Sequence, residues 1–288
     1  MKGTIIKNIS NDYTIDANGK LYICKPRGKF RVNNLTPLVG DHVIFDDKNN
    51  YILEIEKRKN ELIRPSIANI DIAVIVTSAK HPDFDTHLLD KTLTIISYNN
   101  VTPIIYFTKL DLLNDDEKSN INKYIEYYQK IGYTTATKVD ELMSIIKGKT
   151  VVFTGQSGAG KSTLLNKINP ELKLNTDQIS LALGRGKHTT RHTELFDING
   201  TLIADSPGFS KIDFFEMTPI DIRDNMKDMF DNLDKCKYDD CMHISEDGCY
   251  VKEQLKNGNI LESRYNNYRI FINRWLYENI NIHSINQW

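Results

Sequence analysis

Residues 155–162 read G-Q-S-G-A-G-K-S and fit the phosphate-loop pattern G-x-x-x-x-G-K-[ST] at every fixed position. The apolar run at residues 150–154 precedes this motif, and residues 163–167, of helical composition, follow it. Strand, loop and helix in that order are the context in which the motif binds phosphate. Because glycine has no Cβ, backbone N–H groups can close around phosphate oxygens at the positive start of a helix. The motif therefore predicts a nucleoside triphosphate site.

Two side chains of the motif have chemical roles. Lys161 can reach the β and γ phosphates, and the hydroxyl of Ser162 can ligate Mg²⁺. The predicted phosphate-binding set is Gly155, Gln156, Ser157, Gly158, Ala159, Gly160, Lys161, Ser162 and Thr163.

The chain has 288 residues, which is enough for about two domains with a substantial core. Its 40% hydrophobic and 26% charged residues are ordinary for a soluble globular protein. No window approaches the roughly 18 uninterrupted apolar residues of a membrane helix, and residues 1–7 lack a signal-peptide core. We expect a cytoplasmic protein with no membrane partner.

Residues 1–64 show short apolar or alternating runs, broken by turn signals such as Asn18-Gly19 and Asn49-Asn50. Several strands without a helical pattern predict a small β-barrel such as an OB-fold. This part holds 12 Lys and Arg against 8 Asp and Glu, although the net charge of the whole chain is −1. We therefore expect any polyanion to bind this domain.

One basic segment of the predicted barrel, residues 25–31, reads K-P-R-G-K-F-R. Its cations can neutralise phosphates and its phenylalanine can stack on a base, which predicts RNA binding. A solvated hairpin loop explains the same segment equally well. The candidate RNA-binding residues are Lys25, Arg27, Lys29, Phe30 and Arg31.

Residues 65–216 alternate buried strands with helices, and Arg64-Pro65 is the expected linker before them. The β-branched run at residues 72–76 leads to a helix capped by Asp85. A second strand at residues 102–107 also leads to a helix, and a further strand and helix precede the phosphate loop. This alternation predicts a mostly parallel sheet with helices on both faces.

A second nucleotide-binding segment, Thr108-Lys109-Leu110-Asp111, ends one of these strands. In GTP-binding proteins the aspartate of N-K-x-D accepts hydrogen bonds from ring and exocyclic nitrogens of guanine, whereas adenine presents the wrong donors. Threonine here replaces the asparagine, which removes an amide from the motif. We also expect Thr135 and Ala136, at the end of the next strand, to support guanine. The letters S-A-K at residues 78–80 fall one strand too early for that role.

Asp205-Ser206-Pro207-Gly208 follows the second strand of a predicted hairpin whose turn is Asn199-Gly200. In that position it fits the D-x-x-G of GTP-binding proteins. Asp205 would hold Mg²⁺ through water, and the Gly208 N–H would sense the γ-phosphate. Thr190, or Thr189 beside it, is the expected Mg²⁺ ligand from the long, weakly patterned stretch before the hairpin.

The order of these motifs is unusual. An ordinary GTPase begins with the phosphate loop and reaches N-K-x-D last, whereas here Asp111 precedes Gly155. The order indicates a circular permutation, which a domain tolerates because its termini often lie close together at the surface.

Residues 217–288 are helical in pattern around a cluster that reads C-x₄-C-x-H-x₅-C. Three thiolates and one imidazole are enough for a tetrahedral zinc site, and four protein ligands leave no open position, so the predicted zinc is structural. Unrelated free cysteines with a chance histidine are the alternative. The predicted ligands are Cys236, Cys241, His243 and Cys249.

Near the C-terminus, Arg264, Arg269 and Arg274 lie beside an apolar stripe with steps of three and four residues. A packed helix face explains this stripe better than contact with RNA. The chain shows no heptad pattern, and we expect a monomer. Thr218-Pro219 is the expected start of the first helix in this part.

Four features together resemble the circularly permuted, ribosome small-subunit-dependent GTPase family known as RsgA or YjeQ. They are the N-terminal barrel, T-K-x-D before the phosphate loop, D-S-P-G-F, and the cysteine–histidine cluster. The resemblance covers essentially the whole chain and implies an OB-fold, a permuted GTPase domain and a zinc-containing helical domain. It also implies binding to the small ribosomal subunit and its rRNA in late maturation, with hydrolysis of GTP to GDP that the subunit stimulates.

The residue that positions the attacking water is a separate question. Phe209 stands where many GTPases place a water-orienting glutamine. His188 lies in a stretch similar to the family's G-x-x-H-T-T and is the candidate catalytic residue, and contact with RNA or solvent in a mobile loop is its alternative role. Unassisted turnover is expected at roughly 10⁻⁴ to 10⁻³ per second.

Two other functions remain as alternatives. One is an RNA-binding scaffold in which GTP is a ligand and hydrolysis is incidental. The other is an ATP-dependent kinase or transferase, against which the T-K-x-D segment argues.

Overall fold

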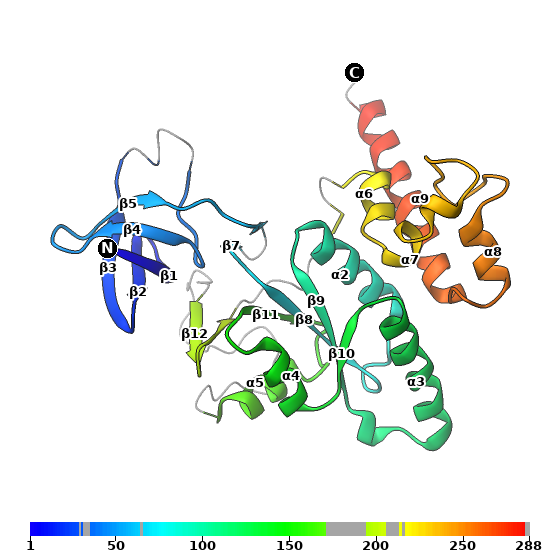
Figure 1. Ribbon diagram of the computed structural model, residues 1–288, viewed down its shortest axis with the longest axis horizontal. Coiled ribbons are helices and arrows are strands. Elements are labelled where there is room, and N and C mark those ends of the chain that lie inside the picture. Colours follow the sequence, from blue (N-terminus) through cyan, green and yellow to red (C-terminus); the bar gives the residue numbers. More distant parts are fainter. Residues whose placement is uncertain are drawn as a thin grey trace.

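The computed structural model describes residues 1–28, 30, 35–63, 66–170, 194–205, 213–214 and 217–285, without the side chains of Ile63, Asp205 and residues 275–285. Along the chain these residues form a barrel, a layered α/β unit and a helical cluster. The barrel lies at the left, next to β12, and the helical cluster lies at the upper right, next to α2 (Figure 1).

The barrel has the five strands β1 (Lys2–Ile9), β2 (Asp12–Ala17), β3 (Lys20–Pro26), β4 (His42–Asp46) and β5 (Tyr51–Ile55). Their order is β1-β2-β3-β5-β4, and β4 pairs again with β1, which closes the barrel. Asn18 and Gly19 join β2 to β3 with φ values of 57° and 80°, as a two-residue hairpin turn requires. Alternate residues such as Ile5, Ile15 and Phe45 fill the interior. The predicted barrel is confirmed.

A short hairpin connects the barrel to the α/β unit. Its strands are β6 (Glu61–Ile63) and β7 (Ser66–Ala68), so the expected linker Arg64-Pro65, outside the described residues, falls between two paired strands. The backbone N–H of Ala68 donates to the carbonyl of Val39 at 2.9 Å. The side-chain amide of Asn69 donates to the carbonyl of Gly40, also at 2.9 Å. The connection is therefore held against the barrel, and the predicted boundary at residue 64 stays a prediction.

The central sheet runs in the order β10-β9-β8-β11-β13-β12. Its parallel strands are β8 (Ile72–Ser78), β9 (Thr102–Thr108), β10 (Thr134–Ala136), β11 (Thr150–Gly155) and β13 (Thr201–Asp205). The last strand in this order, β12 (Glu194–Ile198), is antiparallel to β13 through the Asn199-Gly200 turn. The predicted hairpin and the mostly parallel sheet are confirmed.

Helices cover both faces of this sheet. On one face, Ala73 and Ile75 of β8 belong to the same core cluster as residues of α2 (Thr86–Tyr98) and α3 (Asp115–Lys130). On the other face, Val74 and Val76 pack with residues of α4 (Val139–Ile146) and α5 (Lys161–Ile168). Burial on both faces explains why β8 is apolar at successive positions. The carboxylate of Asp85 caps α2 by accepting from the N–H of Leu88, as predicted.

The barrel and the central sheet are hydrogen-bonded to each other. Strand β1 pairs antiparallel with β12 at Lys7 and Glu194, and the Nζ of Lys7 lies 2.7 Å from a carboxylate oxygen of Glu194. A continuous sheet therefore runs from the barrel into the α/β unit.

The C-terminal cluster consists of α6 (Pro219–Asp224), α7 (Lys227–Phe230), α8 (Tyr250–Lys256) and the long α9 (Glu262–Ile285). Thr218 caps α6 in a capping box with Asp221, which confirms the predicted helix start. Met226, Met229 and Tyr268 are fully buried at the centre of this cluster. Within the described part of the chain, no helix has the length and apolar character needed to cross a membrane.

A buried charge network joins the helical cluster to the α/β unit. The guanidinium of Arg264 on α9 is 1% exposed and donates to Asp90 of α2 at 2.6 Å and to Asp228 of α7 at 2.9 Å. The hydroxyls of Tyr128 and Tyr127 on α3 donate to Asp90 and Asp228, respectively. These charge-assisted bonds offset the cost of burying one cation and two carboxylates.

Replacing Arg264 should therefore destabilise the protein strongly. We expect Arg264→Ala to lower the free energy of unfolding by about 3–5 kcal/mol, because two buried carboxylates lose their cation. Urea or thermal denaturation measures the loss, with Arg269→Ala, an exposed arginine of the same helix, as the matched control. A loss no larger than that of the control would contradict the role given to this network.

Candidate nucleotide site and metal centre

The phosphate loop joins the carboxyl end of β11 to the first turn of α5, as predicted. Gly155, Gly158 and Gly160 have φ values of 147°, 81° and 95°, a region that strains any residue with a side chain. A Cβ on Gly155 would lie 2.1 Å from the carbonyl oxygen of Val76 in the neighbouring strand β8. Glycine is therefore required where the loop leaves the sheet. The first turn of α5 then leaves N–H groups available to an anion.

The T-K-x-D segment contacts this loop directly. The hydroxyl of Thr108 donates to the carbonyl of Ala159 at 2.6 Å and lies 3.2 Å from the carbonyl oxygen of Thr77. The ammonium of Lys109 donates to the carbonyl of Gly158 at 2.7 Å and also to that of His81. The threonine that departs from N-K-x-D thus uses its hydroxyl to join the predicted guanine segment to the phosphate loop.

The other predicted guanine-binding residues lie at the same edge of the sheet. Asp111 is exposed in the short 3-10 helix η1 (Leu110–Leu112) that follows Lys109. Ala136 ends β10 and pairs with Tyr106 of β9, one strand from the segment. The hydroxyl of Thr135 accepts from the side-chain amide of Gln129 at 2.6 Å, so this side chain is turned toward α3. Their contacts with guanine stay predictions.

The predicted magnesium and γ-phosphate residues are only partly within the described structure. Asp205 ends β13, directly after Ala204, which pairs with Val152 of β11. Its backbone therefore lies beside the strand that leads into the phosphate loop. The side chain of Asp205 lies outside the described residues, as do Thr190, Gly208 and the candidate catalytic residue His188.

The cysteine–histidine cluster is assembled as predicted. Cys236 follows the 3-10 helix η4 (Leu233–Lys235), Cys241 and His243 lie in the next loop, and Cys249 is the N-cap residue of α8. One ligand atom from each residue lies within 4.8 Å of all the others. The Nδ1 atom of His243 is 3.6 Å from the sulfur of Cys236 and 3.4 Å from that of Cys249. The four side chains can hold one metal ion.

These separations fit a tetrahedral metal. Bonds of about 2.3 Å to sulfur and about 2.0 Å to nitrogen place the two ligand atoms about 3.5 Å apart. Burial lowers the pKa of His243 to about 4, which leaves its imidazole neutral, as a ligand must be. Tyr265 and Tyr268 of α9 fix the loop, since their hydroxyls donate to the carbonyls of His243 and Met242 at 2.6 and 2.7 Å.

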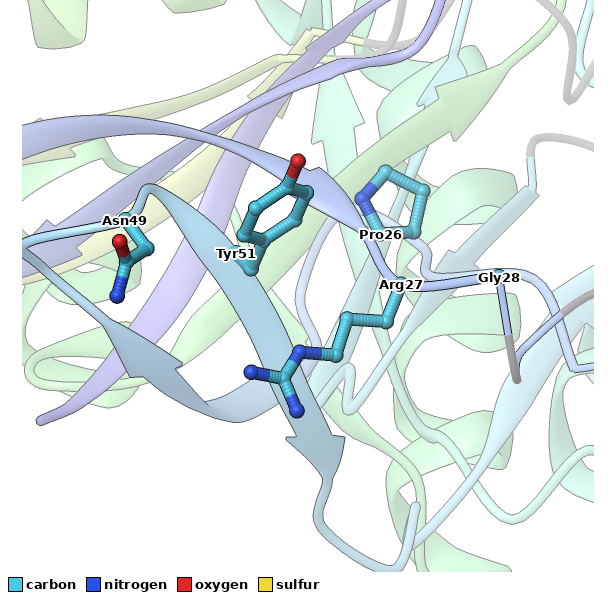
Figure 2. Close-up of a pocket in the computed structure, with 5 residues that line it drawn as sticks. All are labelled: Pro26, Arg27, Gly28, Asn49 and Tyr51. Carbon is cyan, nitrogen blue, oxygen red and sulfur yellow. The ribbon is translucent and has the colours of Figure 1, made fainter.

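The basic segment of the barrel borders a hollow of about 600 Å³, lined by Pro26, Arg27, Gly28, Asn49 and Tyr51 (Figure 2). Lys25 is exposed beside it, whereas Lys29 and Arg31 lie outside the described residues. Phe30 is only 5% exposed, because its ring packs in the barrel core. The predicted stacking role of Phe30 is therefore wrong.

Tyr51 is the aromatic residue of this region that sequence reasoning missed. It is 42% exposed and belongs to the lining of the hollow, on strand β5. The position of Tyr51 directly after the Asn49-Asn50 turn is the sequence signal for an exposed ring. An aromatic residue in an alternating strand is equally typical of a buried position in a barrel core, so the sequence alone does not distinguish the two.

The hydroxyl of Thr108 provides a direct test of the nucleotide site. We expect Thr108→Val to raise the dissociation constant of GDP roughly two- to tenfold, because a partly buried carbonyl of the phosphate loop loses its donor. Titration with a fluorescent GDP analogue measures the change, and Thr102→Val, at the exposed start of the same strand, is the control. Unchanged affinity in Thr108→Val would show that this bond does not support the site.

Two family patterns match adjacent parts of the chain. The sequence pattern of the RsgA GTPase family matches residues 55–215, and that of the RsgA N-terminal domain matches residues 2–52. The chain is 44% identical over 280 residues to the Enterococcus faecalis protein named small ribosomal subunit biogenesis GTPase RsgA, a match that covers 94% of each chain. It is 46% identical to the Limosilactobacillus reuteri protein of that name, over 93% of this chain and 95% of the relative.

Two solved structures share the fold. The crystal structure of YloQ, described as a circularly permuted GTPase, is 38% identical with a TM-score of 0.80, over 96% of this chain and 95% of that one. YjeQ from Thermotoga maritima is 33% identical with a TM-score of 0.82, over 96% of this chain and 98% of that one. With the T-K-x-D segment bound to the phosphate loop, these matches show that the chain belongs to the RsgA family of circularly permuted GTPases.

Proposed function

We propose that this GTPase acts in the biogenesis of the small ribosomal subunit and that the subunit stimulates its hydrolysis of GTP to GDP. The observation that carries the proposal is the bonding of Thr108 and Lys109 to the phosphate loop, which brings together the segments predicted to select guanine and to bind the triphosphate. The ribosomal role is supported by the names of relatives that match the chain over more than nine-tenths of its length. A monomer in the cytoplasm is part of this proposal.

The roles of the site residues follow from their chemistry. Asp111 would accept hydrogen bonds from the guanine ring, and Lys161 would stabilise the charge that develops on the β and γ phosphates. Mg²⁺, which GTPases use with their nucleotide, supplies further compensation of that charge. Ser162 at the first turn of α5, Thr190 and Asp205 are the residues that would hold it.

His188 is the proposed positioning group for the attacking water. The residue after D-x-x-G, Phe209, has no hydrogen-bonding side chain. A neutral imidazole can accept a hydrogen bond from water, and a positioned acceptor of this kind typically contributes a factor of roughly 10² to 10⁴ to a rate.

The barrel surface around the hollow is the proposed rRNA contact. Lys25 and Arg27 would neutralise phosphates, with Lys29 and Arg31 continuing the basic segment, and the exposed ring of Tyr51 would stack on a base. Arg27 and Tyr51 line the same hollow, so one nucleotide can reach both of them.

Hydrolysis assays test the proposed function. The purified protein should hydrolyse GTP at roughly 10⁻⁴ to 10⁻³ per second, the rate of small GTPases without their activator, and much faster when small ribosomal subunits are added. His188→Ala should lower the stimulated rate roughly a hundredfold while the affinity for GDP is kept. Equal use of ATP, or no stimulation by subunits, would contradict the proposal.

The same assays include controls for the surface and for the scaffold alternative. Arg27→Ala and Tyr51→Ala should each reduce the affinity for subunits, measured by co-sedimentation. For Tyr51→Ala the loss of binding free energy should be roughly 1–3 kcal/mol, because a stacking ring is removed. Tyr238→Ala, which removes a similarly exposed tyrosine from the helical cluster, should leave this affinity unchanged. If Lys161→Ala abolished hydrolysis but left release from the subunit unchanged, the scaffold function would be favoured.

We further propose that the metal of the cysteine–histidine cluster is zinc. Three thiolates and one imidazole form a soft, closed ligand set, and the cluster is buried except at Cys236. A metal held by four protein ligands has no position for substrate, so its role is to hold the loop before α8 in place.

Metal analysis tests this assignment. Elemental analysis of the purified protein should find one zinc per chain, and Cys241→Ser should lose it and unfold at a lower temperature, because metal binding contributes folding free energy. Cys24→Ser, which alters the buried cysteine of the barrel, should keep the zinc. Full zinc content in Cys241→Ser would contradict the ligand assignment.

A further inference from the structure

Ser78, Ala79 and Lys80 form a tight turn beside the T-K-x-D segment. The hydroxyl of Ser78, at the end of β8, donates to the carbonyl of Lys80 at 2.7 Å and lies 3.3 Å from its N–H. The N–H of Ala79 donates to the carbonyl of Thr108 at 3.0 Å. This turn is therefore fixed against the first residue of T-K-x-D.

Lys80 extends the turn to α3. Its ammonium lies 2.8 Å from both carboxylate oxygens of Glu117. Glu117 is the third residue of α3 and forms a capping box with Asn114, which comes three residues after Asp111. The hydrogen bond from Lys80 lowers the pKa of Glu117, so the carboxylate is ionised at neutral pH. The ion pair thus holds the segment that directly follows the predicted guanine acceptor.

The next two residues contact the phosphate side of the site. The carbonyl of His81 accepts from the ammonium of Lys109, the same group that donates to Gly158. The Cδ of Pro82 would be 3.4 Å from a Cβ placed on Gly158. Residues 78–82 therefore contact T-K-x-D and the start of α3, and they lie beside the phosphate loop.

We propose that Lys80 is a positioning residue for guanine recognition, acting through Glu117 to fix the turn that presents Asp111. The proposal rests on Asp111 as the guanine acceptor. A carboxylate that binds both the ring N–H and the exocyclic amine of guanine needs a well-defined place, since hydrogen bonds weaken steeply with poor geometry. Hypoxanthine, the base of inosine diphosphate, lacks the exocyclic amine and makes only half of this contact. A less well-positioned Asp111 should therefore lower the affinity for GDP more than the affinity for inosine diphosphate.

Dissociation constants of GDP and of inosine diphosphate test the proposal. Lys80→Met and Glu117→Gln should each raise the dissociation constant of GDP about two- to fivefold, as expected for loss of a partly exposed ion pair, with a smaller change for inosine diphosphate. Glutamine keeps the capping box, so Glu117→Gln removes the charge alone. The double variant should add little to either single one, and Lys80→Arg should restore the preference for guanine.

The matched control is Lys118→Met, in the same turn of α3. The ammonium of Lys118 lies 3.9 Å from a carboxylate oxygen of Asp115, a looser pair than that of Lys80 and Glu117. If Lys80→Met raised the dissociation constants of GDP and inosine diphosphate equally, the positioning role would be overturned. This conclusion requires that Asp111→Asn abolishes the preference for GDP over inosine diphosphate. If Asp111→Asn left the preference intact, the guanine assignment itself would fail, and the role of Lys80 with it. Neither result bears on stimulation by ribosomal subunits, which is measured separately.

Discussion

The hydrogen bonds from Thr108 and Lys109 to the carbonyls of Ala159 and Gly158 are the contacts on which the nucleotide site depends. They join two segments that come in the reverse of the usual order along the chain. Parallel strands make this possible, because β9, β8 and β11 all end at one edge of the sheet. A permutation changes the connections between strands but leaves their order in the sheet, so the chemistry at that edge is kept.

The two flanking domains are attached by different interactions. The helical cluster depends on Arg264 and on Asp90, whose carboxylate also accepts from the amide of Asn267 at 2.7 Å. Because a misplaced partner would leave a buried charge unpaired, we expect such a network to favour one orientation of the cluster. The barrel is attached instead at its edges, by the pairing of β1 with β12 and by hydrogen bonds from Ala68 and Asn69, next to the hairpin of β6 and β7, to the carbonyls of Val39 and Gly40.

Local signals in the sequence predicted most of the fold. The glycines of the phosphate loop, the Asn18-Gly19 turn and the cap residue Asp85 all act within a few residues, and each is confirmed. The errors and omissions concern packing between distant segments. Phe30 lies among cations and suggests an exposed ring, yet it fills the barrel core. Arg264 stands beside two other arginines in the sequence, but its partner Asp90 is 174 residues away.

The permutation determines which domains lie next to the predicted magnesium residue Asp205. The hairpin that ends in Asp205 begins with β12, which pairs with the barrel. Beyond the D-x-x-G segment, Asp213 accepts from Lys91 of α2 at 3.0 Å and from Arg274 of α9 at 3.1 Å. In an ordinary order this part of the chain continues into the GTPase domain itself, whereas here it leads directly into the helical cluster. The hairpin is thereby linked to the barrel by strand pairing and to the helical cluster by the order of the chain.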